Sequence, residues 1–254
     1  MKTQAQLVES FQLCLLRILE ARLNRAHWIV KGGVNLRAWF GSRRSSEDLD
    51  LDVVGCAPHV LRAKLDGLLA SRALAEMLTT QGLSITRISK PKQTDTSQRW
   101  KFELQAQGVS LPLHTKVEFS RRGTQDDEYA LEPVRSEIVR PYGIPAPTAN
   151  HYTARSAVRQ KIRALAGRAE TQARDIWDLD HLLRTTSADP RPLPRELSAA
   201  LPEAIQRTVS LGYDAFKAQI VPYLSSEDQD VHGTRDAWDR MCELVALRLE
   251  EFRS

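Results

Sequence analysis

Three regularly spaced aspartates form the part of the sequence best suited to chemistry. Residues 48–53 read Asp-Leu-Asp-Leu-Asp-Val. Alternation with a period of two predicts a strand whose carboxylates share one face while its apolar side chains enter the core. Carboxylates held so close repel one another, so the strand favours a bound cation, and hard oxygen ligands suit Mg²⁺. The pattern therefore predicts a magnesium site on Asp48 and Asp50. Asp52 extends this pair, either in support of it or simply exposed.

A pair of glycines precedes this strand. Residues 28–30 read as a short buried strand, Gly32 and Gly33 follow it, and residues 34–40 have helical character. Because glycine has no Cβ, the backbone N–H groups here can approach a phosphate closely, and the N-terminus of the following helix favours an anion. We therefore expect Gly32 and Gly33 to contact a phosphate-bearing substrate.

This combination resembles the first motif of the polymerase-β-like nucleotidyltransferases, in which a glycine turn and a spacer precede Asp-apolar-Asp-apolar. The finer pattern is similar to the AbiEii/AbiGii toxin branch of that superfamily, and it consists of Lys31, Gly32, Gly33, Arg44, Ser46, Glu47, Asp48 and Asp50. The resemblance implies that the two aspartates are catalytic and bind Mg²⁺. It also implies that the two glycines, Arg44 and Ser46 bind the nucleotide.

A second group of charged residues lies in the C-terminal half. Lys161 and Arg168 are seven residues apart and so lie on one face of a helix, and Arg-Asp-Ile-Trp-Asp-Leu follows at residues 174–179. This order resembles a second AbiEii signature, in which a lysine is tied to nucleotide binding and an aspartate of the next helix is essential. The resemblance implies nucleotide binding by Lys161 and Arg168 and catalytic roles for Lys161 and Asp175. Asp178 remains an alternative to Asp175.

Two further features involve charged side chains. Residues 113–119 alternate as a strand, which directs Glu118 to the polar face, and the family resemblance implies that it is a third metal ligand. On the predicted helix of residues 154–166, Arg155, Arg159 and Arg163 form a basic stripe. This stripe suits an RNA backbone or is simply a solvated side of the helix.

The remaining elements predict an α+β fold whose sheet is followed by an all-helical C-terminal domain, and the resemblance implies that this is a polymerase-β-like mixed sheet flanked by helices. We expect an amphipathic helix over residues 3–25, a helix from Pro58 to about residue 80, strands at 83–89 and 100–106, and a loop between these strands. Residues 121–150 are polar and proline-rich, so no long helix fits there. Further helices are expected at 154–166, 171–183, 196–210, 212–224 and 235–252, the last with Thr234 as its N-cap. We place one domain at residues 1–145 and a helical domain, which completes the nucleotide and RNA cleft, at 146–254.

Composition limits the class of protein. The chain has 254 residues, 42% of them hydrophobic, and no apolar run long enough to span a membrane. The polar and acidic residues near the N-terminus argue against a signal peptide, and three widely spaced cysteines without metal-binding spacing indicate a reduced, cytoplasmic protein. A net charge of +4 gives weak support for an RNA or nucleotide partner.

These features together predict an Mg²⁺-dependent nucleotidyltransferase that transfers a nucleoside monophosphate from an NTP to an acceptor. The resemblance implies an RNA acceptor such as a tRNA 3′ end, a role as the toxin of a toxin–antitoxin pair with a cognate antitoxin, and phage defence. The alternatives are an Mg²⁺-dependent phosphodiesterase or nuclease, and a non-catalytic RNA- or protein-binding module. Both leave the glycine pair and Lys161 without a shared purpose. The sequence does not fix the NTP, the oligomeric state or the role of residues 186–254.

Overall fold

The computed structural model describes residues 2–123 and 127–253. Contacts divide the chain into two compact units. The first, the sheet unit, holds the residues up to Gly41 together with Ser45–Tyr152. The second, the helical unit, holds Ser42–Arg44 together with the residues from Thr153 onward. The sheet unit therefore extends past the expected domain boundary at residue 145 and includes a strand beyond it.

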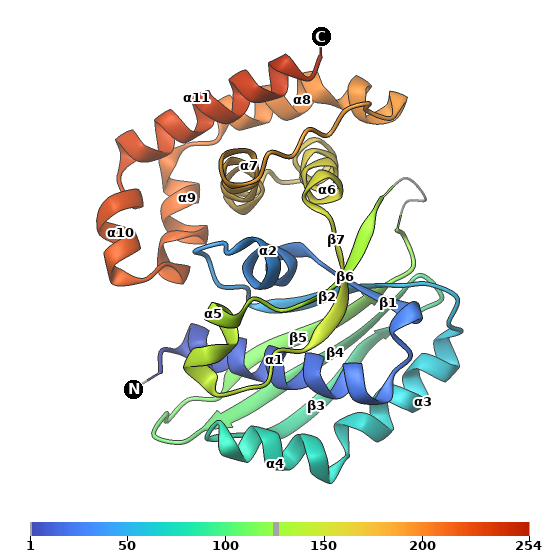
Figure 1. The fold of residues 1–254 in the computed structure, drawn as a ribbon. Helices are drawn as coiled ribbons and strands as arrows, with labels where there is room; N and C mark the ends of the chain where they lie inside the picture. The colour runs from blue at the N-terminus through green and yellow to red at the C-terminus, as the bar shows by residue number, and fades with distance from the viewer. Residues whose placement is uncertain (1, 124–126, 254) are drawn as a thin grey trace. The chain divides into compact units, whose positions relative to one another are not determined.

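Among the described residues, seven strands form one mixed sheet in the sheet unit (Figure 1). They are β1 (Trp28–Lys31), β2 (Asp48–Val53), β3 (Leu83–Gln93), β4 (Ser97–Ala106), β5 (Leu113–Ser120), β6 (Tyr129–Pro133) and β7 (Thr148–Tyr152). The order across the sheet is β3-β4-β5-β2-β1-β7-β6. Strand β2 is parallel to β5 and β1 is parallel to β7, while the other neighbours are antiparallel. The predicted α+β class with a mixed sheet is confirmed.

Helices of the sheet unit bury the apolar face of this sheet. They are α1 (Gln4–Arg22), η1 (Arg25–His27), α2 (Gly32–Phe40), α3 (Pro58–Leu69), α4 (Arg72–Thr80), α5 (Ser136–Val139) and η2 (Arg140–Tyr142). Helices α1, α3 and α4 lie along one face of the sheet (Figure 1). Phe11 of α1, Leu65 of α3 and Leu49 and Leu51 of β2 belong to one buried cluster. Burial of these side chains supplies the main favourable term for folding the unit.

The predicted alternation along β2 is confirmed. Leu49 and Leu51 are fully buried, whereas Asp48 and Asp50 stay partly exposed on the other face. Strand β5 alternates in the same way, so Glu118 lies on the polar face. The register aligns Asp50 with Glu118 directly.

Two predicted elements of the sheet unit differ from the structure. The single helix expected from Pro58 to residue 80 is two helices, because the Oγ of Ser71 accepts a hydrogen bond from Leu74 N–H and begins a new helix. The expected loop between the two strands is mostly strand, since β3 continues to Gln93 and β4 begins at Ser97. Pro91 is tolerated because β3 is an edge strand.

The proline-rich segment of residues 121–150 contains strands that the sequence did not predict. The edge strand β6 pairs with β7, and β7 pairs in turn with β1. No helix longer than the short α5 occurs among its described residues, which agrees with the expectation. The strands escaped prediction because β6 is short, mostly exposed and ends in Pro133, so it carries no clear alternation.

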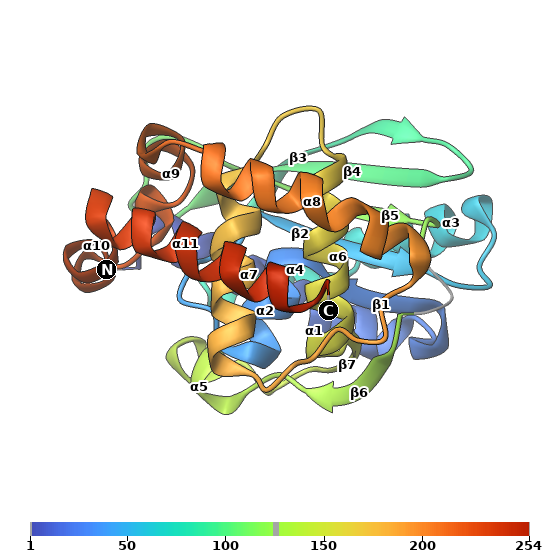
Figure 2. The same ribbon diagram turned by 90° about the horizontal axis from the view of Figure 1, so that it is seen from above.

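The helical unit contains α6 (Ala154–Gly167), α7 (Ala173–Thr185), α8 (Arg195–Ser210), α9 (Tyr213–Gln219), η3 (Val221–Tyr223), α10 (Ser226–His232) and α11 (Arg235–Glu251). Helices α8 and α11 lie across α6 and α7 (Figure 2). Its core includes Ile162, Leu179 and the stacked rings of Phe216 and Trp238, whose centroids are 4.7 Å apart. No helix in the described part of the chain is long and apolar enough to cross a membrane.

Most predicted helices of this unit are present. Thr234 caps α11 as expected, because its side chain accepts a hydrogen bond from Ala237 N–H. The helix expected over residues 212–224 ends earlier, at Gln219, and a 3-10 turn containing Pro222 follows it. The sequence did not predict α10, because Ser226–His232 is polar and lacks apolar periodicity.

Candidate active site

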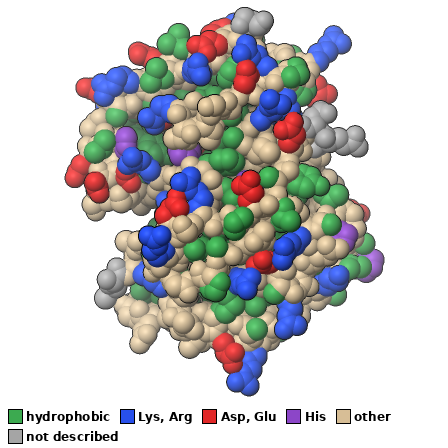
Figure 3. Space-filling model, in the orientation of Figure 1, with side chains coloured by type: hydrophobic (Ala, Val, Ile, Leu, Met, Phe, Trp, Pro, Cys, Tyr) green, Lys and Arg blue, Asp and Glu red, His purple; other side chains and the backbone are tan. Residues whose placement is uncertain are grey.

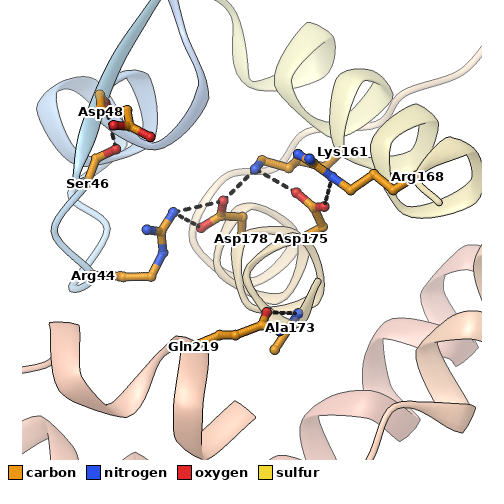
Figure 4. A network of polar contacts seen from close by, with 9 residues as sticks. All are labelled: Arg44, Ser46, Asp48, Lys161, Arg168, Ala173, Asp175, Asp178 and Gln219. Atoms are coloured by element: carbon orange, nitrogen blue, oxygen red, sulfur yellow. Dashed lines mark hydrogen bonds and ion pairs between the residues drawn. The ribbon is translucent and has the colours of Figure 1, made fainter. Parts of the chain in front are cut away.

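The paired aspartates of β2 form the centre of the candidate site in the sheet unit. The Asp48 carboxylate forms an ion pair with Lys116 of β5, at 2.6 Å. The Oγ of Ser46 donates a hydrogen bond to the Asp48 carbonyl oxygen at 2.9 Å, which fixes the backbone where β2 begins (Figure 4). The predicted residue Ser46 therefore supports the strand through its side chain.

The predicted glycine turn lies directly beside Asp50. Gly32 is the first residue of α2 and has a φ of +67°, a backbone conformation that residues other than glycine rarely adopt. A Cβ at this position would lie only 3.2 Å from Oδ2 of Asp50. The backbone therefore approaches the carboxylate closely because residue 32 is glycine. Gly33 follows as the second residue of α2.

The surroundings of Asp50 disfavour its ionised form. Burial raises the pKa of Asp50, and the charge of Asp48 raises it further. Lys31 and Lys116 act in the opposite direction without cancelling the shift. A raised carboxyl pKa means that the ionised form is disfavoured, and a nearby cation would relieve that cost.

Glu118 lies close to this pair but is engaged by other groups. Its Oε1 accepts a hydrogen bond from Ser97 at 2.8 Å, and its Oε2 forms an ion pair with Arg99 at 2.6 Å. Burial opposes the ionised form, but these two partners hold the pKa of Glu118 below its ordinary value. Within the described residues, no cluster of three or more His, Cys, Asp or Glu side chains has metal-binding geometry. As placed, Glu118 is the partner of Arg99.

Asp52 has a definite role that the sequence left open. Its side chain is only 5% exposed, and its Oδ1 lies 2.5 Å from the Lys31 ammonium. Its Oδ2 accepts a hydrogen bond from the Tyr152 hydroxyl at 2.8 Å. Asp52 therefore fixes Lys31, whose charge acts on Asp50. Only the pairing of strands reveals this, since Tyr152 is distant in sequence.

The helical unit gathers the second predicted group into one buried network (Figure 4). The Lys161 ammonium lies 3.0 Å from Asp175 and 2.6 Å from Asp178. Arg168 contacts Asp175 at 2.7 Å, and Arg44 contacts Asp178 at 3.2 Å. The structure therefore brings Arg44, Lys161, Arg168 and Asp175 together and adds Asp178, so both candidate aspartates belong to the network.

Charges within this network stabilise one another. Burial alone would lower the pKa of Lys161, but the charges of Asp178 and Asp175 hold it above its ordinary value. Burial alone would raise the pKa of Asp178, but Arg44 and Lys161 hold it below its ordinary value. Three cations face two carboxylates, which leaves a net charge of +1 (3 − 2). Arg168 is the most exposed member, with 38% of its side chain accessible.

The predicted basic stripe on α6 is wrong at its central residue. Arg159 is buried and donates hydrogen bonds to the carbonyl oxygens of Pro190 and Pro192, at 2.8 and 2.6 Å. Arg155 donates to the carbonyl oxygen of Asp189 at 3.0 Å. These side chains hold the loop before α8, because the proline-rich loop offers carbonyl acceptors that need donors. Arg159 therefore cannot contact an RNA backbone.

Paired aspartates on a mixed sheet, beside a glycine turn that opens a helix, define the class of the nucleotidyltransferases. The solved structures with a similar fold include JHP933 from Helicobacter pylori, with a TM-score of 0.61, 18% identity and coverage of 99% of this chain and 95% of that chain. They also include an antigenic nucleotidyltransferase-like protein from Paracoccidioides brasiliensis, with a TM-score of 0.50, 16% identity and coverage of 84% and 94%.

The family follows from the sequence itself. The profile of the nucleotidyl transferase AbiEii toxin family, of type IV toxin–antitoxin systems, matches residues 14–251. The chain therefore belongs to the AbiEii nucleotidyltransferase toxin family. A comparison with curated protein sequences gave no significant match.

Proposed function

We propose that this nucleotidyltransferase transfers a nucleoside monophosphate from an NTP to an RNA acceptor in an Mg²⁺-dependent reaction. We also propose that the acceptor is a tRNA 3′ end and that a cognate antitoxin protein controls the activity. The observation that carries the proposal is the Asp48 and Asp50 pair beside the backbone of Gly32. The family resemblance supports the tRNA acceptor, and the toxin–antitoxin description of the family supports the antitoxin.

The donor set fits a magnesium ion. Both aspartates offer hard carboxylate oxygens from one rigid strand, and burial together with the charge of Asp48 raises the pKa of Asp50, a cost that a bound cation would relieve. Asp48 and Asp50 would hold the ion, and Glu118 would join them only by exchanging its contacts with Ser97 and Arg99. Bound there, the metal would neutralise triphosphate charge and activate the attacking hydroxyl.

Residues of the chain itself would bind and orient the substrate. The backbone N–H groups at Gly32 and Gly33 open α2, and a helix N-terminus favours phosphate. Lys31, held by Asp52, would keep positive charge close to Asp50. In the helical unit, the network of Arg44, Lys161, Arg168, Asp175 and Asp178 has a net positive charge that suits a triphosphate. We assign the direct phosphate contact to Arg168, because it is the most exposed of these cations.

This assignment refines the role expected for Lys161. Lys161 is almost fully buried and contacts two carboxylates, so its charge would act mainly by balancing Asp175 and Asp178. Replacement of Arg168 by Gln should weaken NTP binding about tenfold, the scale of one charge-assisted hydrogen bond. Calorimetric titration with NTP and Mg²⁺ measures this effect. Unchanged affinity would remove Arg168 from the nucleotide site.

The direct test of the reaction uses label transfer. Purified protein is incubated with Mg²⁺, total RNA and each α-labelled NTP in turn, and the parent should label RNA with at least one NTP. Asp48→Asn should reduce transfer by several orders of magnitude, because a metal ligand and its charge stabilisation are lost. Asp95→Asn, which removes an exposed carboxylate between β3 and β4, is the matched control and should retain activity.

Three outcomes would contradict the proposal. Near-normal transfer by Asp48→Asn would exclude the aspartate pair as the catalytic centre. Release of nucleoside monophosphates from RNA without label transfer would indicate a phosphodiesterase. RNA binding that needs neither Mg²⁺ nor NTP, without any transfer, would indicate a binding module.

A further inference from the structure

A groove of about 500 Å³ lies on the polar face of the sheet unit beside Asp48. Its lining includes Arg87, Lys101, His114 and Lys116 from strands β3, β4 and β5. The lining also holds the carboxylates of Glu47, Asp48 and Glu103, and Glu103 forms an ion pair with Arg87 at 3.3 Å. The charges of the groove are therefore mixed, as they are over the face drawn in Figure 3. The order of the side chains in this groove, more than its total charge, indicates a ligand.

Strand register sets these side chains in a row that leads away from the catalytic pair. Asp48 on β2 aligns with Lys116 on β5, Lys116 aligns with Lys101 on β4, and Lys101 aligns with Ser89 on β3. Figure 1 shows the same order of strands. Because neighbouring strands lie about 4.8 Å apart, the backbone of Lys101 is roughly 10 Å from that of Asp48.

Two like charges face each other in this row. Lys101 and Lys116 are directly opposite on antiparallel strands, so their side chains share one face, and like charges in such positions destabilise a sheet. Asp48 compensates Lys116 at 2.6 Å. Lys101 is exposed and makes no ion pair with any residue that the structure describes. An anion that contacts both ammonium groups would remove this repulsion.

We propose that Lys101 and Lys116, together with the Ser89 hydroxyl, bind the phosphate backbone of the acceptor RNA near its 3′ end. The inference rests on the proposed function, because that reaction brings a 3′ hydroxyl to Asp48 and Asp50. A cation on Asp48 would also weaken its hold on Lys116, which frees a second ammonium for the RNA. Lysine and serine are common phosphate ligands in nucleic-acid complexes, and they position a strand without reading its sequence.

Because Lys101 and Lys116 repel each other, replacement of Lys101 should weaken RNA binding without lowering the stability of the protein. Lys101→Gln should weaken binding of single-stranded RNA about tenfold and reduce the slope of log affinity against log salt by about 0.7. The same change should leave the unfolding free energy unchanged or higher, because it removes a like charge opposite Lys116. Fluorescence anisotropy of a 5′-labelled oligoribonucleotide, measured with Mg²⁺ and without NTP, gives affinity and salt slope. Urea unfolding gives the stability.

Lys64→Gln on α3 is the matched control, because it removes the same charge from an exposed helix position. It should bind RNA like the parent. If the parent labels RNA in the transfer assay but Lys101→Gln binds RNA with parental affinity and salt slope, the inference is overturned while the proposed function stands. A raised KM for NTP with unchanged RNA affinity would place the triphosphate in the groove and would also overturn it. If the parent transfers nothing to RNA, both the proposed function and the inference fail.

Discussion

Removal of one carboxylate from the buried network of the helical unit should destabilise that unit strongly. Asp178 is inaccessible to solvent and contacts both Lys161 and Arg44. Asp178→Asn preserves the shape of the side chain but raises the net charge of the network from +1 to +2. Removing one partner from a buried ion pair costs about 3–5 kcal/mol. We expect a loss of unfolding free energy of this size.

Lys161→Met provides the comparison. It lowers the net charge of the network to zero and leaves Asp175 with Arg168 and Asp178 with Arg44. It also removes the cost of keeping an ammonium group out of water, so its loss of unfolding free energy should not exceed about 2 kcal/mol. Amide hydrogen exchange of α6 and α7 measures both losses within the helical unit itself. Asp239→Asn on the exposed side of α11 is the control.

The dependence on pH has a definite direction. The folded-state pKa of Asp178 is below its ordinary value of 3.8, so its stabilising contribution is present above that value and is lost as pH falls through the folded pKa. The folded-state pKa of Lys161 is above 10.5, so its contribution is present below that value and is lost as pH rises through the folded pKa. Asp178→Asn should therefore flatten the acid side of the stability profile. If Lys161→Met lost as much unfolding free energy as Asp178→Asn, or more, the argument from the net charge of the network would be refuted.

Other outcomes follow from single side chains. Asp50→Asn should abolish transfer and raise the unfolding free energy at neutral pH. The pKa of Asp50 is raised in the folded protein, so its ionised form lowers stability at pH values above its ordinary pKa of 3.8. A lower unfolding free energy of the variant in urea would contradict this. Arg159→Ala should lower the unfolding free energy by about 1–3 kcal/mol, since the buried carbonyl group of Pro190 loses its hydrogen-bond donor. A variant of unchanged stability with weakened RNA binding would instead support the RNA-binding role predicted for Arg159. Expression of the parent without antitoxin should inhibit growth, and Asp48→Ala should not; equal inhibition by both would separate toxicity from nucleotidyl transfer.

The sequence alone determined the centre of the sheet unit. The alternation along β2 is a local property of the chain, so it identified the strand, its buried face and the shared side of Asp48 and Asp50. The glycine turn was equally local, because the positive φ of Gly32 and its approach to Asp50 both require the absence of a Cβ. Most helices were predicted for the same reason, since their apolar periodicity lies within each segment.

Tertiary structure decided which charged side chains meet. The Lys31–Asp52–Tyr152 cluster depends on strand pairing, and the Arg44 contact with Asp178 joins residues 134 positions apart. The seven-residue spacing placed Lys161 and Arg168 on one helix face, but Arg168 follows the end of α6 in an extended conformation. The spacing also gave no sign that the Lys161 ammonium would be enclosed by two carboxylates. Arginines along one face of a helix give the same sequence pattern whether solvent or a loop covers that face. The sequence therefore predicted an accessible Arg159, whereas the loop before α8 covers it. Burial and long-range pairing depend on elements far away in the chain, so local periodicity could not reveal them.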